Sequence, residues 1–250
     1  PVHVKVDTGM HRVGASPDEA IAVARAVTDA PTLLLEGFWT HLAVADEPDN
    51  AYTAAQLERF EAARGRLATA GIEPALLHAA NSAGAIAHRA ARYDLVRCGI
   101  ALYGQPPSGA VGGDIGLRPV LSLKARVSHV KPLAAFERVS YGLRWQTERD
   151  TVLATVPLGY ADGVTRRLGA LGGEVLIGGR RRPLAGTVTM DQVMVDCGPD
   201  AVVVPGDEVV FIGSQGTEEI TADEWATRLD TISYEVLCGI GPRVPRVYLG

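Results

Sequence analysis

The sequence predicts an α/β domain followed by a mainly antiparallel β domain, and three observations carry this prediction. Strand and helix patterns alternate through residues 1–103, and short β-branched runs separated by glycine turns fill the second half. A stretch rich in proline and glycine, residues 105–117, lies between them. Successive βα units imply parallel strands covered by helices, here the C-terminal half of a (β/α)8 barrel of the TIM type. We therefore expect a partial barrel over residues 1–116 and a β domain over residues 117–250.

The first strand and the first helix carry clear local signals. Residues 2–7 alternate apolar and polar side chains, as a strand does. Ser16 then stands at an N-cap position, with Pro17 at the first helical position and Glu19 three residues after the cap. This capping-box pattern predicts a helix that continues through residues 20–27.

Three further units complete the predicted partial barrel. The apolar residues 33–43 predict a second strand, and the helical spacing of apolar residues within 51–70 predicts the helix that follows it. Residues 76–79 and 94–103 predict two more strands, joined by a short helix over residues 82–91.

The second half of the chain has the pattern of a β domain. Its predicted strands cover residues 121–130, 151–157, 174–177, 183–188, 193–196 and 208–212. One helix interrupts them, because Thr221 and Glu224 form a second capping-box pattern that opens a helix over residues 222–229.

Composition excludes several classes of function. The chain has 250 residues, of which 47% are hydrophobic, enough for a core in one or two domains. Its net charge of −5 and lack of like-charge blocks argue against a nucleic-acid partner. We expect no membrane span, because no apolar run approaches the roughly 20 residues that one needs. Cys98, Cys197 and Cys238 are far apart and lack metal-ligand spacing, so we expect reduced cysteines, a cytoplasmic location and no metal site.

Polar residues at predicted strand ends are candidates for chemistry in the first domain. Lys5 and Asp7 share one face at the end of the first strand, as barrel active sites require, although a plain charge pair would look the same. His41 follows an apolar strand, a place also typical of a core histidine, and His78 is interpreted as structural. Ser82 opens a helix, where its hydroxyl suits either a phosphate or an ordinary N-cap.

Tyr141 lies in a glycine-punctuated turn of the second domain, within the segment VSYG. A tyrosine in such a turn is usually structural, because its ordinary pKa of about 10 makes it a poor base. Its role therefore stays open on the pattern alone.

Five segments in this order resemble the alanine racemase family, whose members use pyridoxal 5'-phosphate (PLP) to interconvert L- and D-alanine and so supply D-alanine for peptidoglycan. They are KVDTGMHR (5–12), RCGIALYG (97–104), VSYG (139–142), LGYADG (158–163) and TMDQ (189–192). The resemblance extends to RVPRVY (243–248) and so covers nearly the whole chain.

The resemblance implies a PLP site in the first domain. Ser82 and the backbone amides of Gly99 and Ile100 would bind the phosphate, and His41 would lie beside the ring. Arg97 would face the pyridine nitrogen. Because an arginine keeps its proton, it weakens the ring as an electron sink and disfavours transamination.

The resemblance also implies substrate-handling residues. Tyr141 would deprotonate L-alanine, while Arg12 and the Met190 amide would hold the substrate carboxylate. Lys5, often carbamylated in the family, would orient Arg12. Two supporting residues would line the same entrance, Tyr160 and Asp191. Since the family takes Tyr141, Tyr160 and Met190 from a partner subunit, a homodimer with shared active sites is implied.

The chain departs from the family in two places. The family's PLP-anchoring lysine should precede Lys5, yet the chain starts at Pro1 inside a strand pattern. We expect an N-terminal part to be missing and the chain alone to be inactive. Pro242 stands where many members have a phosphate-contacting tyrosine. Two other functions stay open: a broad-spectrum amino-acid racemase of the same fold, or a non-catalytic fragment that binds PLP or dimerises.

Overall fold

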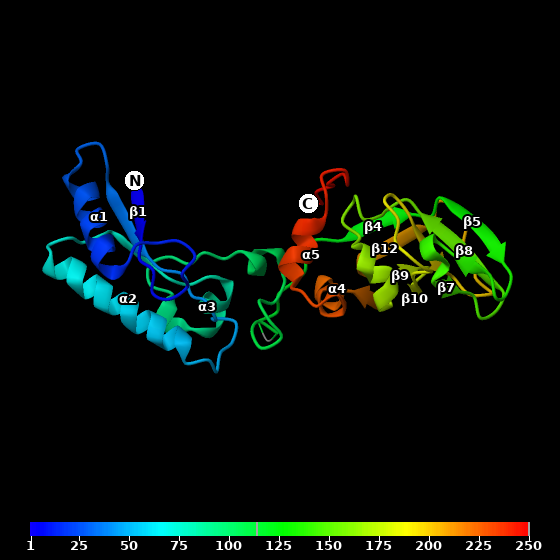
Figure 1. Cartoon of the computed structure of the whole chain (residues 1–250), viewed down its shortest axis with the longest axis horizontal. Helices are drawn as coiled ribbons and strands as arrows, with labels where there is room; N and C mark the ends of the chain where they lie inside the picture. Colours follow the sequence, from blue (N-terminus) through cyan, green and yellow to red (C-terminus); the bar gives the residue numbers. More distant parts are fainter. Residues whose placement is uncertain (114, 250) are drawn as a thin grey trace. The chain divides into compact units, whose positions relative to one another are not determined.

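The chain folds into two sets of strands, each with its own helices (Figure 1). The structure is a computed structural model that describes residues 1–113 and 115–249, and it divides into one unit over residues 1–118 and another over residues 119–250. The first unit holds a parallel sheet in the order β1-β2-β3. Its strands are β1 (Val2–Lys5), β2 (Leu35–Trp39) and β3 (Leu76–His78).

Two long helices pack in the first unit, α1 (Pro17–Asp29) and α2 (Tyr52–Thr69). Helix α1 contacts β1, β2 and α2 (Figure 1). Val4 of β1, Phe38 of β2 and Phe60 of α2 are buried in one core, where the Phe38 and Phe60 rings stack with centroids 5.6 Å apart. The predicted α/β character of this unit is confirmed, whereas closure into a barrel stays a prediction.

The capping box predicted at Ser16 is present. The Glu19 amide donates to the Ser16 hydroxyl at 3.4 Å, and the Ser16 amide donates to the Glu19 carboxylate at 3.0 Å. Two backbone donors that a helix start would leave unpaired are thus satisfied, which is why α1 begins at this point.

The strand predicted over residues 94–103 is wrong. This segment runs beside β3, with the Asp94 and Arg97 amides donating to the Leu77 and Ala80 carbonyls. The Leu77 amide, however, donates to the carboxylate of Asp94 instead of a carbonyl, so no regular ladder forms. The segment ends in a 3₁₀ helix, Ile100–Tyr103. The helix predicted over residues 82–91 is likewise split, into α3 (Ser82–Ala87) and a 3₁₀ turn, Arg89–Ala91.

The second unit is built from antiparallel strands, as predicted. One sheet runs β10-β9-β12-β13, with β4 also paired to β12, a second runs β11-β8-β5, and β6 pairs with β7. The strands are β4 (Leu123–Arg126), β5 (His129–Leu133), β6 (Arg138–Val139), β7 (Trp145–Gln146), β8 (Thr151–Val156), β9 (Glu174–Ile177), β10 (Arg180–Pro183), β11 (Val193–Asp196), β12 (Glu208–Gln215) and β13 (Glu218–Ile220).

One predicted strand of this unit is displaced. The strand expected over residues 183–188 lies instead at β10, where it pairs with β9 across a turn of two glycines with positive φ, Gly178 and Gly179. Beyond it, Leu184 makes only an isolated bridge to Val195, and Gly186 has a φ of +88° that an extended strand does not tolerate. The predicted helix is present as α4 (Ala222–Leu229), and a second helix follows as α5 (Ser233–Gly239).

An ion-pair network ties α4 to the sheet of the second unit. Arg181 of β10 pairs with Glu224 of α4 at 2.8 Å and with Glu174 of β9 at 3.2 Å. Arg228 contacts the same two carboxylates at 3.1 and 3.2 Å. Hydrogen bonds from Arg181 hold the pKa of Glu224 below its ordinary value, so ionised Glu224 is favoured in the folded state.

This network predicts a loss of stability in acid. A carboxylate whose pKa is lowered by folding stabilises the fold above the unfolded pKa of about 4.3, and that contribution disappears as the pH falls through the folded pKa. Glu224→Gln should therefore lower the free energy of unfolding at pH 7, and the difference from wild type should shrink below about pH 4. Urea denaturation at a series of pH values measures both, with Glu148→Gln, at an exposed position, as the control. Parallel pH profiles for wild type and Glu224→Gln would contradict the prediction.

Candidate active site

A half-buried guanidinium, that of Arg97, lies at the carboxyl ends of the three parallel strands. Nη2 of Arg97 donates to the carbonyls of Thr40 and Ala79 at 2.9 and 3.1 Å, and Nη1 donates to Nδ1 of His78 at 2.5 Å. The guanidinium also lies over the Trp39 ring, 4.5 Å from its centroid. Burial lowers the pKa of Arg97 to about 10, so the group keeps its positive charge near neutral pH. None of these contacts uses Nε or the second N–H of Nη1, which leaves two N–H groups for a ligand.

Two histidines accept hydrogen bonds from this guanidinium. Besides His78, Nδ1 of His41 lies 3.3 Å from Nη2 of Arg97. Burial and the positive charge of Arg97 lower the pKa of each ring to about 4, so both are neutral near pH 7 and each offers a bare nitrogen as acceptor. The interpretation of His78 as structural stays a prediction, to which the structure adds direct contact with Arg97.

Positive charge accumulates around His41. Lys5 and Arg12 both lower the pKa of His41, so both lie close enough to act on its ring. The nearby carboxylate of Asp7 is occupied by its own turn, where it accepts from the Gly9 amide at 2.9 Å and pairs with His11 at 3.2 Å. Because Arg97, Arg12 and Lys5 all act on His41 while the nearby carboxylate is engaged, this end of the sheet favours an anionic ligand.

The nitrogen of Lys5 donates to the carbonyl of Val13 and lies 5.3 Å from the Trp39 ring centroid. Burial lowers the pKa of Lys5, Asp7 opposes that effect, and Arg12 lowers the pKa further. A lysine amine held in this way is easier to deprotonate, which carbamylation requires.

A second feature of the same unit suits a phosphate. Asn81, not Ser82, caps α3, since the Asn81 side chain accepts from the Gly84 amide at 2.9 Å. The Ser82 hydroxyl turns instead to the next loop, where it accepts from the amides of Gly99 and Ala101 at 2.9 and 3.3 Å. A Cβ built on Gly99 would meet no atom within 4 Å, so open space lies over this loop. These contacts use the oxygen of the hydroxyl and leave its hydrogen for a ligand, so this loop and the open space over it suit an anion.

The candidate residues of the second unit are exposed and share one support. Tyr141, Met190 and Tyr160 have 73%, 54% and 42% of their surface exposed. The segment over residues 186–192 carries Met190 itself and contacts the turns that carry Tyr141 and Tyr160. The Thr187 hydroxyl donates to the Tyr141 carbonyl at 2.9 Å, and the Tyr160 amide donates to the Thr189 carbonyl at 3.0 Å.

An ion pair joins these turns to the C-terminal segment. Arg243 lies 2.6 Å from the carboxylate of Asp191 and 3.3 Å from that of Asp162, which is buried and also accepts from the Gly159 amide at 2.9 Å. The backbones of the two segments also pack closely, because a Cβ on Gly163 would lie 2.6 Å from the Gly239 carbonyl oxygen. The glycines of the LGYADG segment thus permit the packing that positions Tyr160.

One residue that holds the site of the first unit carries no signal in the sequence. Gln56 of α2 is fully buried, and its Oε1 accepts from the Ala43 amide at 2.8 Å. Its Nε2 donates to the His41 carbonyl at 3.1 Å and to the Thr8 hydroxyl at 3.3 Å. The helical pattern of apolar residues conceals this role, because a glutamine within it is normally solvent-facing.

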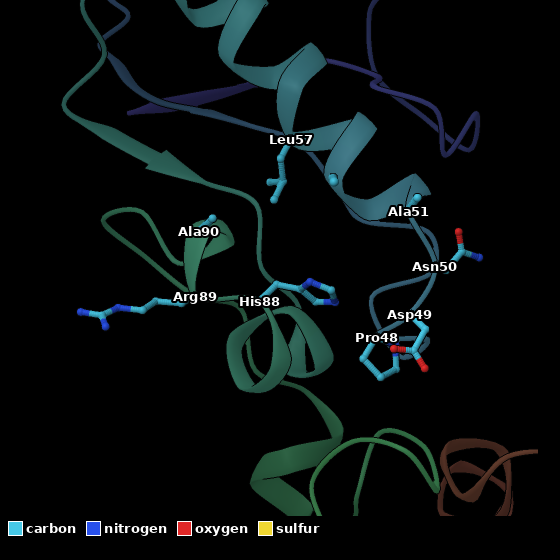
Figure 2. Close-up of a pocket in the computed structure, with 9 residues that line it drawn as sticks. Pro48, Asp49, Asn50, Ala51, Leu57, His88, Arg89 and Ala90 are labelled. Atoms are coloured by element: carbon cyan, nitrogen blue, oxygen red, sulfur yellow. The ribbon is translucent and has the colours of Figure 1, made fainter.

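A hollow elsewhere in the first unit is separate from these residues. Figure 2 shows the His88 ring pointing into it, opposite Pro48 and Asp49, while Arg89 points away. Nε2 of His88 lies 3.1 Å from the Ala45 carbonyl, and this hydrogen bond explains the orientation of the ring. None of the site residues expected from the sequence lines this hollow.

Two family models match adjacent parts of the chain. The alanine racemase N-terminal domain matches residues 1–107, and the alanine racemase C-terminal domain matches residues 120–248. The chain belongs to the alanine racemase family. It is 53% identical, over its whole length, to the alanine racemase of Symbiobacterium thermophilum and 48% identical to that of Thermobifida fusca.

A solved alanine racemase from Clostridium difficile 630 superposes on 99% of the chain with a TM-score of 0.93 and 40% identity. The chain spans 66% of the length of the Symbiobacterium relative and 64% of the Clostridium chain. Within the residues that the structure describes, no helix has the length and apolarity that a bilayer crossing needs.

The contacts of Gln56 predict its importance for stability. Gln56→Leu should lower the free energy of unfolding by at least about 2 kcal/mol, because it leaves the Ala43 amide and the His41 carbonyl without buried partners, each costing about 1–3 kcal/mol. Chemical denaturation measures the change. Gln56→Glu is the matched control, since it keeps the acceptor for Ala43 and should cost less when protonated. A loss in Gln56→Leu no larger than that of an exposed glutamine would contradict this account.

Proposed function

We propose that the protein interconverts L-alanine and D-alanine with PLP as its cofactor. The observation that carries this proposal is the half-buried, charged Arg97, held by two neutral histidines with N–H groups to spare. Most PLP enzymes place an acid at the ring nitrogen, whereas an arginine limits charge build-up on the ring and suits racemisation over transamination. The family and its named alanine racemases support the same reaction.

The residues present fit PLP. The Ser82 hydroxyl and the Gly99 loop, with open space above them, would hold the phosphate together with Ile100, and His41 would lie beside the ring. When bound, PLP supplies the electron-withdrawing ring that makes the α-proton of an amino acid acidic. The protein supplies charge and orientation: Lys5 and Arg12 add positive charge where a substrate carboxylate would arrive.

Tyr141 is the proposed base for L-alanine. Its side chain is 73% exposed in this unit, and the backbone is held in a tight turn, with positive φ at Ser140 and Gly142. Such a turn presents the phenol outward on a fixed stem, which suits a group that acts on another surface. Met190 would help to hold the substrate carboxylate through its amide, and Tyr160 and Asp191 would border the same entrance. A family lysine serves as the second base.

We propose that the active enzyme is a homodimer with shared sites, in which Tyr141, Tyr160 and Met190 complete the partner's cofactor site. Their high exposure supports this proposal, because each offers an apolar or aromatic side chain for contact. Residues 1–116 would form part of a (β/α)8 barrel, and residues 117–250 would form the β domain. The product D-alanine would serve peptidoglycan synthesis.

Replacing Tyr141 tests the assignment of the base. In a polypeptide that also carries the family's PLP-anchoring lysine, Tyr141→Phe should reduce L-to-D turnover by about 10²–10⁴, the usual value of a positioned acid–base group. Exchange of the α-proton of D-alanine with solvent, followed by NMR, should suffer less. Tyr103→Phe, another exposed tyrosine, is the control. Equal loss of exchange from both enantiomers would count against two separate bases.

The 250-residue chain alone should racemise no alanine and bind no PLP covalently. Of its three lysines, Lys124 is paired with Glu208 at 3.1 Å, Lys131 belongs to β5, and Lys5 is engaged with the Val13 carbonyl. The test is to add PLP, reduce with borohydride and map modified lysines by mass spectrometry, with Lys5→Arg as the matched control. Stoichiometric labelling of Lys5 together with racemisation would overturn this prediction.

A further inference from the structure

Four side chains form a continuous hydrogen-bonded series that runs from the half-buried guanidinium to the edge of the first sheet. Nη1 of Arg97 is 2.5 Å from Nδ1 of His78, and Nε2 of His78 is 2.7 Å from Nδ1 of His3. Nε2 of His3 is 2.8 Å from the carboxylate of Glu36. His3, Glu36 and His78 lie on β1, β2 and β3, so every strand of the sheet contributes one member.

The backbone of β2 is shaped to let this series pass. In the sheet register His3 lies opposite Gly37, and Trp39 lies opposite His78. A Cβ on Gly37 would overlap the His3 ring. The ring of His3 therefore crosses β2 only because residue 37 is glycine, and it reaches His78 with ring centroids 5.0 Å apart.

The donors and acceptors of the series run in one direction. A guanidinium only donates, so Nδ1 of His78 must be bare. A neutral imidazole then carries its proton on Nε2, and burial and Arg97 hold the pKa of His78 at about 4, so the ring stays neutral. His78 consequently donates to Nδ1 of His3, and His3 donates from Nε2 to the Glu36 carboxylate, which only accepts.

The guanidinium at one end and the carboxylate at the other impose the same direction. With His3 protonated on Nδ1 instead, His3 would donate to Nε2 of His78, and the proton of His78 would move to Nδ1. That N–H would then face an N–H of Arg97 at 2.5 Å. Trp39 fixes the planes of both groups, since it stacks on His78 with centroids 5.4 Å apart and lies under Arg97, so neither group can easily turn away.

We propose that Glu36 and His3 are positioning residues that lock the His78 ring in place, in the Nε2–H tautomer that Arg97 requires, and so aim Arg97 at the ring nitrogen of the cofactor. The functional part of this proposal, the orientation of Arg97 toward the cofactor, rests on the proposed racemase activity. The hydrogen-bonded arrangement of Glu36, His3 and His78 does not. Glu36 and His3 thus act on the guanidinium of Arg97 without touching a ligand.

Histidine nitrogen NMR on the full chain tests the lock without cofactor or substrate. Long-range ¹H–¹⁵N spectra distinguish bare from protonated ring nitrogens, and His→Gln variants assign the signals. In wild type, His3 and His78 should each show a bare Nδ1 and a protonated Nε2. A protonated Nδ1 on His78 in wild type would overturn the proposal at once.

Glu36→Leu is the decisive variant, because leucine has nearly the size of glutamate but cannot accept a hydrogen bond from Nε2 of His3. The ring of His3 then loses its anchor and no longer holds His78 in one place. The ring-nitrogen signals of His3 and the Nε2–H signal of His78 should shift or broaden, while the signals of exposed His129 stay unchanged. Glu36→Gln is the matched control and should keep the wild-type spectra, because its amide oxygen still accepts from His3. Wild-type His3 and His78 signals in Glu36→Leu would contradict the proposal.

Gly37→Ala provides an independent second test, because it displaces the His3 ring while all four members stay in the sequence. Because Arg97 still sets the tautomer of His78, the expected change is a shift or broadening of the His78 Nε2–H signal, and a wild-type signal would overturn the proposal. In a polypeptide with the PLP-anchoring lysine, Glu36→Leu should also shift the absorption of bound PLP. Absence of racemisation in wild type would refute the proposed function, whereas the tautomer spectra decide the lock separately.

Discussion

The first unit depends on the cost of burying one positive charge. A guanidinium removed from water is tolerated only where acceptors and aromatic faces replace its hydration. Arg97 receives carbonyls from the ends of two strands, bare nitrogens from two histidines and the face of Trp39. Each of these groups must occupy a set position, so the loops after β2 and β3 are arranged around the charge. Gln56 then holds the loop that carries His41 from the opposite side.

In the second unit, close backbone packing has the corresponding role. The segment over residues 186–192 contacts the turns that bear Tyr141 and Tyr160, and Arg243 neutralises the buried carboxylate of Asp162 beneath them. Exposed side chains are thereby held on stems that cannot move independently. A rigid backbone beneath exposed side chains is what a surface needs when it presents reactive groups to another molecule.

Local signals in the sequence predicted much of the fold. The capping patterns at Ser16 and Thr221 gave the starts of α1 and α4, because a cap is decided by residues within one turn. Strands β9 and β11 were predicted with the bounds that the structure has. The motifs also pointed to Arg97 and Ser82, whose polar surroundings in the structure suit the roles inferred for them.

Non-local contacts explain what the sequence concealed. The strand expected over residues 94–103 fails because the Asp94 side chain takes a hydrogen bond that a ladder needs, which no pattern of apolar residues reports. Likewise, His78 is a partner of Arg97, and Gln56 is buried, only through segments far away in the chain. Residue pairs of this kind become visible when the strands are placed side by side.

The crossing of His3 over Gly37 also constrains how this sequence can change over evolutionary time. A lineage that loses the histidine frees position 37 to acquire a side chain, and β-branched residues would then be favoured on a strand. Once that happens, the histidine cannot return by a single substitution, because its ring would meet the new Cβ. Loss of the pair is therefore far easier than its recovery, and the two positions should vary together across relatives.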